Sequence, residues 1–146
     1  MSSKLEKQLN VPGSATFKGA VPFSQVANVQ RKADIVLFVE GTDIFNRNKA
    51  RLSFSTKLTD YFQAGKCIVA YGSNEIAPID YLKKNQIALV ASKKNELYEN
   101  MQQLVENPKL INVYGKAAYE FGKENHSNEK MKNILKSSLI NAATSK

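Results

Sequence analysis

Short, continuous apolar runs separated by helix-period segments constrain the fold of this chain more than any other feature. The clearest run is DIVLFVE at residues 34–40, and a second run, CIVAY, follows at residues 67–71. Continuous apolar character is typical of a strand that is covered on both faces, and strands that alternate with helices are typical of a parallel sheet. The sequence therefore predicts an α/β domain with helices on both faces of a mainly parallel sheet.

The same apolar runs and helix-period segments predict the positions of the individual strands and helices. We expect about four strands, at residues 15–21, 34–40, 66–71 and 86–91. We expect helices from Pro22, from Ser53 or Ser55 to Gly65, after residues 72–74, and at residues 93–106, 108–123 and 127–143. Residues 41–52 show no consistent period and are expected to form a long loop. In open α/β sheets, ligands bind at the loops that follow the carboxyl ends of the strands.

The bulk properties describe one globular unit. With 146 residues, of which 42% are hydrophobic and 23% charged, the chain fits a single domain, residues 1–146, rather than two. No apolar run approaches the roughly 18 to 20 residues that cross a bilayer, and the first ten residues lack a signal-peptide pattern. We expect a cytoplasmic protein. Cys67 lies within an apolar run and is expected to be a buried, inert thiol.

The formal net charge of +8 favours an anionic partner. A nucleoside diphosphate, an anionic membrane surface and nucleic acid all satisfy this condition, as does a solvated basic face without a partner. No aromatic and basic RNA motif, zinc-ligand spacing or distinct helix-turn-helix pattern occurs. Nucleic acid is therefore the weaker alternative, and association with the inner membrane face stays open.

The pattern of the segment from Ser53 to Gly72 is typical of a complete binding unit. Hydroxyl groups open a helix, Asp60 lies in its first turns, Gly65 ends it, and a buried strand follows. The free N–H groups and the positive dipole at a helix start favour a phosphate or diphosphate. A carboxylate one turn further on can bind the hydroxyls of an attached sugar.

The order of these segments resembles a known enzyme family. ATFKGAVP, ADIVLFVE, FSTKLTDYFQAGKCIVAYG and QIALVASKKNELYENMQQLVENP together resemble the C-terminal, donor-binding half of GT-B glycosyltransferases, especially the large retaining group often called family 4, or group 1. The resemblance covers about residues 14–123 and is strongest at residues 55–69. It implies a Rossmann-like fold and transfer of a sugar from a nucleoside diphosphate sugar, usually without a metal ion.

The resemblance also assigns roles to individual residues. Ser55, Thr56 and Lys57 would stabilise the diphosphate, and Asp60 would bind the ribose hydroxyls. Gly41 and Thr42 would border the donor sugar, and Val21 ends the turn beside the base. The resemblance identifies no catalytic residue, no metal ligand and no cofactor other than the nucleotide sugar. The implied pathway is transfer of a hexose to a glycan, a lipid-linked intermediate or a cell-envelope polymer, as in polysaccharide biosynthesis.

The chain departs from the family pattern in two places. Many members have a second glutamate eight positions before the ribose ligand, and this chain has Leu52 there. The first two strands of the donor domain and the whole acceptor domain have no counterpart. We therefore expect a truncated domain that is inactive alone and needs an acceptor domain or partner chain. Its incomplete sheet leaves an edge at which self-association can occur.

Other residues have competing interpretations. His126 is the only histidine and lies in a polar segment, which predicts a solvated side chain. Tyr61 and Phe62 are predicted to pack in the core. The basic residues Arg47, Lys49 and Arg51 either face solvent or close over a diphosphate. A non-catalytic Rossmann-like module that serves assembly or regulation is an alternative function for the whole chain.

Overall fold

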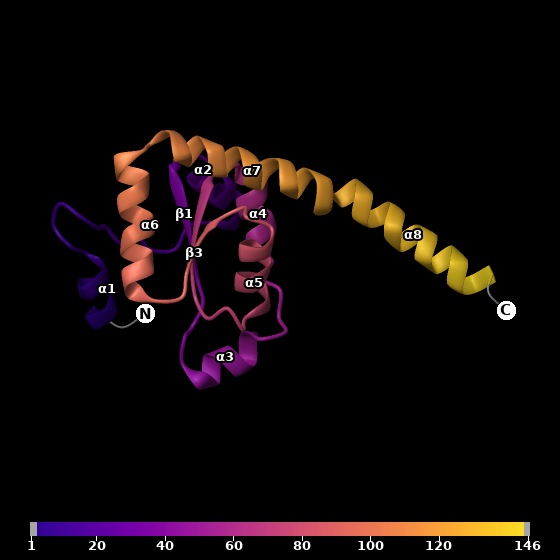
Figure 1. Cartoon of the computed structure of the whole chain (residues 1–146), viewed down its shortest axis with the longest axis horizontal. Coiled ribbons are helices and arrows are strands. Elements are labelled where there is room, and N and C mark those ends of the chain that lie inside the picture. Colours follow the sequence, from indigo (N-terminus) through magenta and orange to yellow (C-terminus); the bar gives the residue numbers. More distant parts are fainter. Residues whose placement is uncertain (1–2, 145–146) are drawn as a thin grey trace.

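The fold is built on one parallel sheet. The computed structural model describes residues 3–144, within which three strands lie side by side in chain order: β1 (Ile35–Val39), β2 (Cys67–Tyr71) and β3 (Leu89–Ala91) (Figure 1). All pairs are parallel, with Leu37 opposite Val69 and Val69 opposite Leu89. The predicted Rossmann-like α/β fold is confirmed, with three strands instead of about four.

The missing strand is the one predicted at residues 15–21. In this part of the chain, Ala15 forms a single antiparallel bridge with Val11, and no strand follows. Gly19 has a φ of 77°, which interrupts an extended conformation. The apolar residues there therefore do not pair with the sheet, and β1 is an edge strand.

Helices cover the sheet and extend beyond it. Their bounds are α1 (Ser3–Leu9), α2 (Phe23–Lys32), α3 (Ile44–Ala50), α4 (Lys57–Ala64), α5 (Ala77–Lys84), α6 (Lys94–Glu106), α7 (Lys109–Asn125) and α8 (Asn128–Thr144). The six helices predicted from the sequence are present, and Gly65 ends α4 with a left-handed φ of 63°, as predicted. Helices α1 and α3 were not predicted.

The core has two parts, one on each face of the sheet. On one face α4 and α5 pack against Val36 and Phe38 of β1 and the neighbouring residues of β2. On the other face α6 and the first half of α7 pack against Cys67, Val69 and Leu89. The side chains of Leu37 and Val39 are 58% and 64% exposed. The second face is therefore open at its β1 edge.

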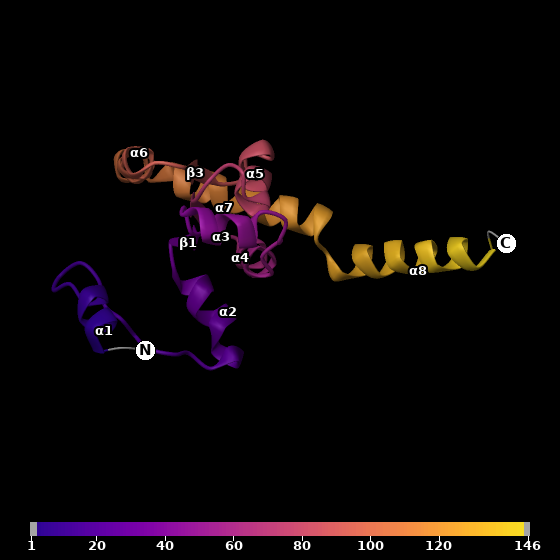
Figure 2. The same ribbon diagram turned by 90° about the horizontal axis from the view of Figure 1, so that it is seen from below.

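Helices α1, α2 and α8 project from this sandwich (Figures 1 and 2). Helix α2 contacts α4, but Phe23 at its first position is 92% exposed. Helix α8 extends away from the sheet, and none of its residues is buried. The apolar stripe of α8, formed by Met131, Ile134, Leu135, Leu139 and Ile140, is thus exposed. No helix in residues 3–144 has the combination of length and apolar content that crossing a membrane requires.

Candidate functional site at the carboxyl edge of the sheet

The carboxyl ends of β1 and β2 lie together. Glu40 directly follows β1, and its N–H donates to the carbonyl oxygen of Tyr71 at 2.9 Å. Gly72 directly follows β2, and its N–H donates to the carbonyl oxygen of Ala91 at 3.0 Å. A Cβ atom on Gly72 would lie 3.2 Å from that of Glu40. The main chain thus holds Glu40 at the edge where ligands of parallel sheets bind.

Helix α3 lies directly over this edge, where the sequence predicted a loop. The carboxylate of Asp43 begins the helix by accepting the N–H of Asn46 at 3.0 Å. This hydrogen bond lowers the pKa of the Asp43 carboxyl. A Cβ atom on Gly41 would lie only 2.5 Å from the Asn46 Cβ. The close approach of α3 therefore requires glycine at position 41.

The three basic residues of this region have different surroundings. Arg47 forms an ion pair with Glu75 at 3.2 Å, from its Nε atom to Oε2, and so connects α3 to the segment after β2. Lys49 lies with its Nζ atom 4.2 Å from the centre of the Phe45 ring. Arg51 is exposed, and its carbonyl oxygen accepts the N–H of Ala77. Lys49 is the one of these three that reaches the groove described next.

An open groove of about 630 Å³ lies between the end of β1, helix α3 and the start of α4. Its lining residues are Glu40, Gly41, Asn46, Lys49, Ser53, Phe54, Ser55 and Thr56. The structure thus brings together Gly41, Ser55 and Thr56 of the residues predicted to bind the donor. Thr42 is exposed beside Gly41 and Lys57 is exposed at the first position of α4, but neither lines the groove.

The start of α4 differs from the prediction that a serine caps it. The N-cap is Thr56, which has helical φ and ψ of −61° and −22° and forms no side-chain capping bond. The N–H groups of Leu58 and Thr59 instead donate to the carbonyl oxygens of Ser55 and Thr56, both at 3.1 Å. Helical geometry at Thr56 turns its hydroxyl away from the position of a cap. Within the described residues, the hydroxyl groups of Ser55 and Thr56 are consequently without hydrogen bonds.

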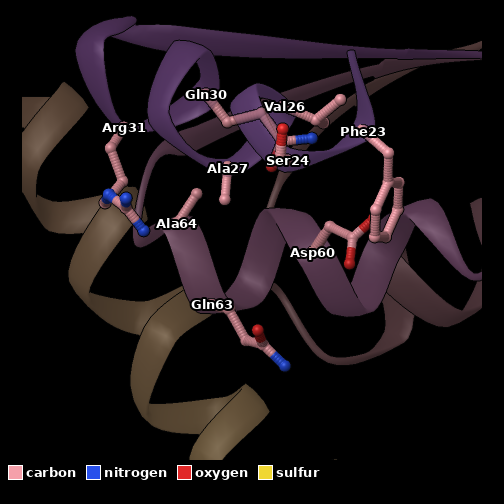
Figure 3. A pocket seen from close by; sticks show the side chains of 9 residues that line it. All are labelled: Phe23, Ser24, Val26, Ala27, Gln30, Arg31, Asp60, Gln63 and Ala64. Atoms are coloured by element: carbon pink, nitrogen blue, oxygen red, sulfur yellow. The ribbon is translucent and has the colours of Figure 1, made fainter.

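Asp60 belongs to a second cavity, of about 330 Å³, between α2 and α4 (Figure 3). Figure 3 shows its carboxylate beside the ring of Phe23, with Arg31 at the other end of the cavity. Asp60 follows Thr56 by four residues, which corresponds to about 6 Å along a helix axis. Val21, the residue predicted near the base, is exposed two positions before Phe23 and does not line this cavity. Helix α4 therefore presents predicted ligand groups to two cavities.

The packing roles predicted for Tyr61 and Phe62 are confirmed. Phe62 is 1% exposed, and Tyr61 packs against the same core cluster while its hydroxyl donates to the carbonyl oxygen of Leu37 at 3.1 Å. Burial, together with the nearby charge of Asp60, raises the pKa of Tyr61. Cys67 is buried as predicted, and burial raises the pKa of its thiol to about 11. This thiol is therefore protonated and unreactive at neutral pH.

The solvated histidine predicted at position 126 is wrong. The His126 ring is half-buried among four aromatic rings, and its Nε2 atom is hydrogen-bonded to the Tyr81 hydroxyl at 2.8 Å. The rings are those of Phe54, Phe62, Tyr81 and Phe121, with centroids 5.4 to 6.0 Å from that of His126. Burial lowers the pKa of His126. The polar residues around His126 in the sequence gave no sign of this, because all four rings come from other segments or from the preceding helical turn.

Leu52, which stands where many family members have a second glutamate, is exposed to solvent. Its side chain is 90% exposed in the segment between α3 and α4. Within residues 3–144, no three side chains of His, Cys, Asp or Glu are grouped so that they could hold a metal ion. Of the residues that line the groove, Glu40 and Lys49 are the charged ones.

A parallel sheet with helices on both faces and a groove at its carboxyl edge is typical of Rossmann-like α/β domains. The chain also matches, over residues 2–136, the model of a family described as glycosyl transferase-like. This match covers most of the chain, and the protein belongs to that family. Neither the curated proteins nor the solved structures gave a match. Membership of this family supports a glycosyltransferase function in general terms.

Proposed function

We propose that this domain binds a nucleoside diphosphate sugar as the donor half of a GT-B glycosyltransferase. The main observation is the position of α4. Its start borders the groove that contains Ser55 and Thr56, and Asp60 at the end of its first turn lines the cavity beside α2. A ligand that lies across the first turn of α4 would have its diphosphate on one side and its nucleoside on the other.

The proposed diphosphate site is the start of α4. Because Leu58 and Thr59 use their N–H groups within the turn, the N–H groups of Ser55, Thr56 and Lys57 would bind the anion. The helix dipole favours negative charge at this end. Lys49 and Lys57 would add positive charge. These groups supply the stabilisation that a metal ion gives in other transferases, so the proposed transfer is metal-independent.

The proposed nucleoside site is the cavity between α2 and α4. The Asp60 carboxylate would accept hydrogen bonds from the ribose hydroxyls, and Phe23, which is 92% exposed, offers a ring on which a base can stack. Val21 would border the base from the turn before α2. The donor sugar, a hexose in this proposal, would occupy the groove near Glu40, Gly41 and Thr42.

Transfer to an acceptor needs groups that we do not assign to this chain. The acceptor would be a glycan, a lipid-linked intermediate or a cell-envelope polymer, bound by an acceptor domain or a partner chain. With an exposed leucine at position 52, the contact that a second acid would make with the sugar is absent. We therefore expect the chain alone to bind donor weakly without turnover, in the cytoplasm or at the inner membrane face. Measurable sugar transfer by the purified chain would contradict this.

A titration with UDP, GDP and ADP and their sugar derivatives, followed by calorimetry or NMR, tests the donor site. Asp60→Asn should weaken nucleotide binding by roughly ten-fold or more, since a hydrogen bond to a charged group contributes about 1.5–3 kcal/mol. Ser55→Ala should have a smaller effect in the same direction. Asp34→Asn is the matched control, because Asp34 is exposed just before β1, at the other end of the strand. If no nucleotide binds, or if Asp60→Asn binds like Asp34→Asn, the assignment fails.

The exposed Leu52 also favours a second candidate function, a non-catalytic module of the same fold. Such a module would bind a nucleotide or a partner without supporting transfer. The two candidates predict different results when an acceptor domain is added: the donor half would then transfer sugar, and the non-catalytic module would not. If a nucleotide-binding chain, combined with its natural acceptor domain, still transfers no sugar, the non-catalytic function is favoured.

A further inference from the structure

The aromatic cluster around His126 connects the end of α7 to the groove. Phe54 belongs to this cluster, and its ring lies nearly parallel to that of His126, with centroids 5.8 Å apart and an interplanar angle of 17°. Phe54 also lines the groove together with Ser53, Ser55 and Thr56. One residue is therefore shared between the cluster and the candidate anion site.

The segment that contains Phe54 has neither helix nor strand structure between Leu52 and Ser55. Its main chain is held on both sides: the carbonyl oxygen of Arg51 accepts the N–H of Ala77, and that of Ser55 accepts the N–H of Leu58. Between these two points, Phe54 packs its ring against Tyr81 at 5.1 Å and against His126. The ring contacts thus fix the middle of the segment.

His126 is itself held in a defined orientation. Its Nε2 atom is 2.8 Å from the Tyr81 hydroxyl, and its ring contacts Phe62 of α4 and Phe121 of α7. We propose that His126 is a positioning residue for the donor site: through Phe54 it fixes the segment Ser53–Thr56 in the conformation that binds the diphosphate. This inference rests on the proposed function for its ligand, but the positioning itself is observable without any ligand.

The surroundings of His126 favour its neutral form. A cavity of about 220 Å³ beside it is lined from α4 by Thr59, Phe62 and Gln63, which do not titrate, and from α7 by Tyr119, Gly122 and Lys123. Tyr81 faces it from α5, and Phe54 from the segment before α4. Lys123 adds positive charge, and no carboxylate lines this cavity among the described residues. Protonation of His126 should therefore weaken its packing against Phe54.

The first test uses the full chain without ligand. Because His126 is the only histidine, its ring signals in an NMR pH titration are unambiguous. The amide signals of Ser53, Phe54, Ser55 and Thr56 should shift with the same midpoint as the His126 ring. In His126→Phe, which keeps a ring but cannot titrate, these amide shifts should disappear. If the amides do not follow the ring, or still shift in His126→Phe, the proposal is wrong.

The second test measures affinity for UDP, GDP and ADP. His126→Ala and Phe54→Ala should each weaken binding by roughly two- to ten-fold, the range expected for loss of an aromatic pair, and the double variant should lose little more than either alone. His126→Phe should lose less than His126→Ala. Lys132→Ala on the exposed surface of α8 is the control. Full affinity in His126→Ala would overturn the proposal. If no nucleotide binds the unaltered chain, the proposed function fails, and the amide titration still decides whether His126 positions the segment.

Discussion

Helices α7 and α8 are consecutive and of equal length, 17 residues each, yet they have opposite environments. Helix α7 packs on α4, α6 and β2 and contributes to both parts of the core. Helix α8 buries no residue, although it contains Ile134, Leu135 and Leu139. An apolar stripe alone is therefore not sufficient for burial.

The difference lies in small residues and in available partners. In α7, Gly115, Ala118 and Gly122 are buried, and they follow one face at three- and four-residue spacing. A Cβ atom on Gly115 would lie 2.6 Å from the carbonyl oxygen of Gly65. The main chain of α7 can thus approach the turn between α4 and β2 closely. Helix α8 has larger side chains on its stripe but no facing element in the described chain.

The largest expected effect compares truncation of one leucine in the core beneath α7 with truncation of one leucine on α8. Leu58 is fully buried in the cluster that also contains Ala118, and Leu58→Ala should lower the free energy of unfolding by about 2–5 kcal/mol. Leu139 is 62% exposed, and Leu139→Ala should change it by less than about 0.5 kcal/mol. Urea unfolding measures both. A loss above about 1 kcal/mol for Leu139→Ala would show that α8 packs on something in solution.

The next effect tests the close approach of α7. Gly115→Ala adds one methyl group against main-chain atoms that cannot move freely, and should cost about 1–3 kcal/mol of unfolding free energy. This loss would occur although alanine is the better helix former. Ser137→Ala in α8 is the matched control and should be neutral or slightly stabilising. Equal stabilisation by both substitutions would show that α7 does not approach α4 and β2 as closely as described.

A smaller effect concerns the junction of the two helices at His126. Because burial lowers its pKa in the folded chain, the unfolded chain binds more protons as the pH falls below the ordinary value of about 6.5. The stability from His126 is therefore complete above that pH and is lost as the pH falls from about 6.5 through the folded pKa. Chemical unfolding at several pH values should show this loss, and His126→Phe should lack it. Asp43 and Glu96 have lowered pKa values, so their contribution is lost only at more acidic pH.

The smallest effect is expected from removing most of α8. A chain that ends at Asn128 keeps His126 and the aromatic cluster, and its unfolding free energy should stay within about 0.5 kcal/mol of that of the full chain. Thermal or urea unfolding of the two chains gives the comparison. A clear loss of stability would mean that α8 contributes packing that its exposed position does not suggest, for example in a self-associated form.

Much of the fold could be predicted because the signals are local. The continuous apolar runs at β1 and β2, the helix periods of α4, α6 and α7, and Gly65 after α4 all led to correct elements. The predictions failed where a local pattern lacked a tertiary partner. Residues 15–21 contain apolar residues but do not pair with the sheet, and Val105 of α6 is 76% exposed although the neighbouring Leu104 is buried. Helix α3 was missed because its residues show no consistent apolar period.

In the candidate site, too, local features could be predicted and contacts between segments could not. The sequence indicated Gly41, Ser55 and Thr56, which the structure groups in one groove, and Asp60, which it places in a second cavity. It could not indicate Lys49 as the basic residue that reaches the groove, nor the ion pair that holds Arg47 away from it. These outcomes depend on how α3 lies over Gly41, which is a contact between segments.

By itself, the sequence determined the α/β class, the parallel strands and the end of α4 at Gly65, because hydrophobic periodicity and helix-end chemistry act over a few residues. The tertiary structure alone decided that His126 lies among aromatic rings, that β1 is an open edge, and that α7 is packed while α8 is exposed. Burial depends on which segments meet in space, and residues far apart in the chain decide it. The same apolar and polar patterns can therefore end in the core or in solvent.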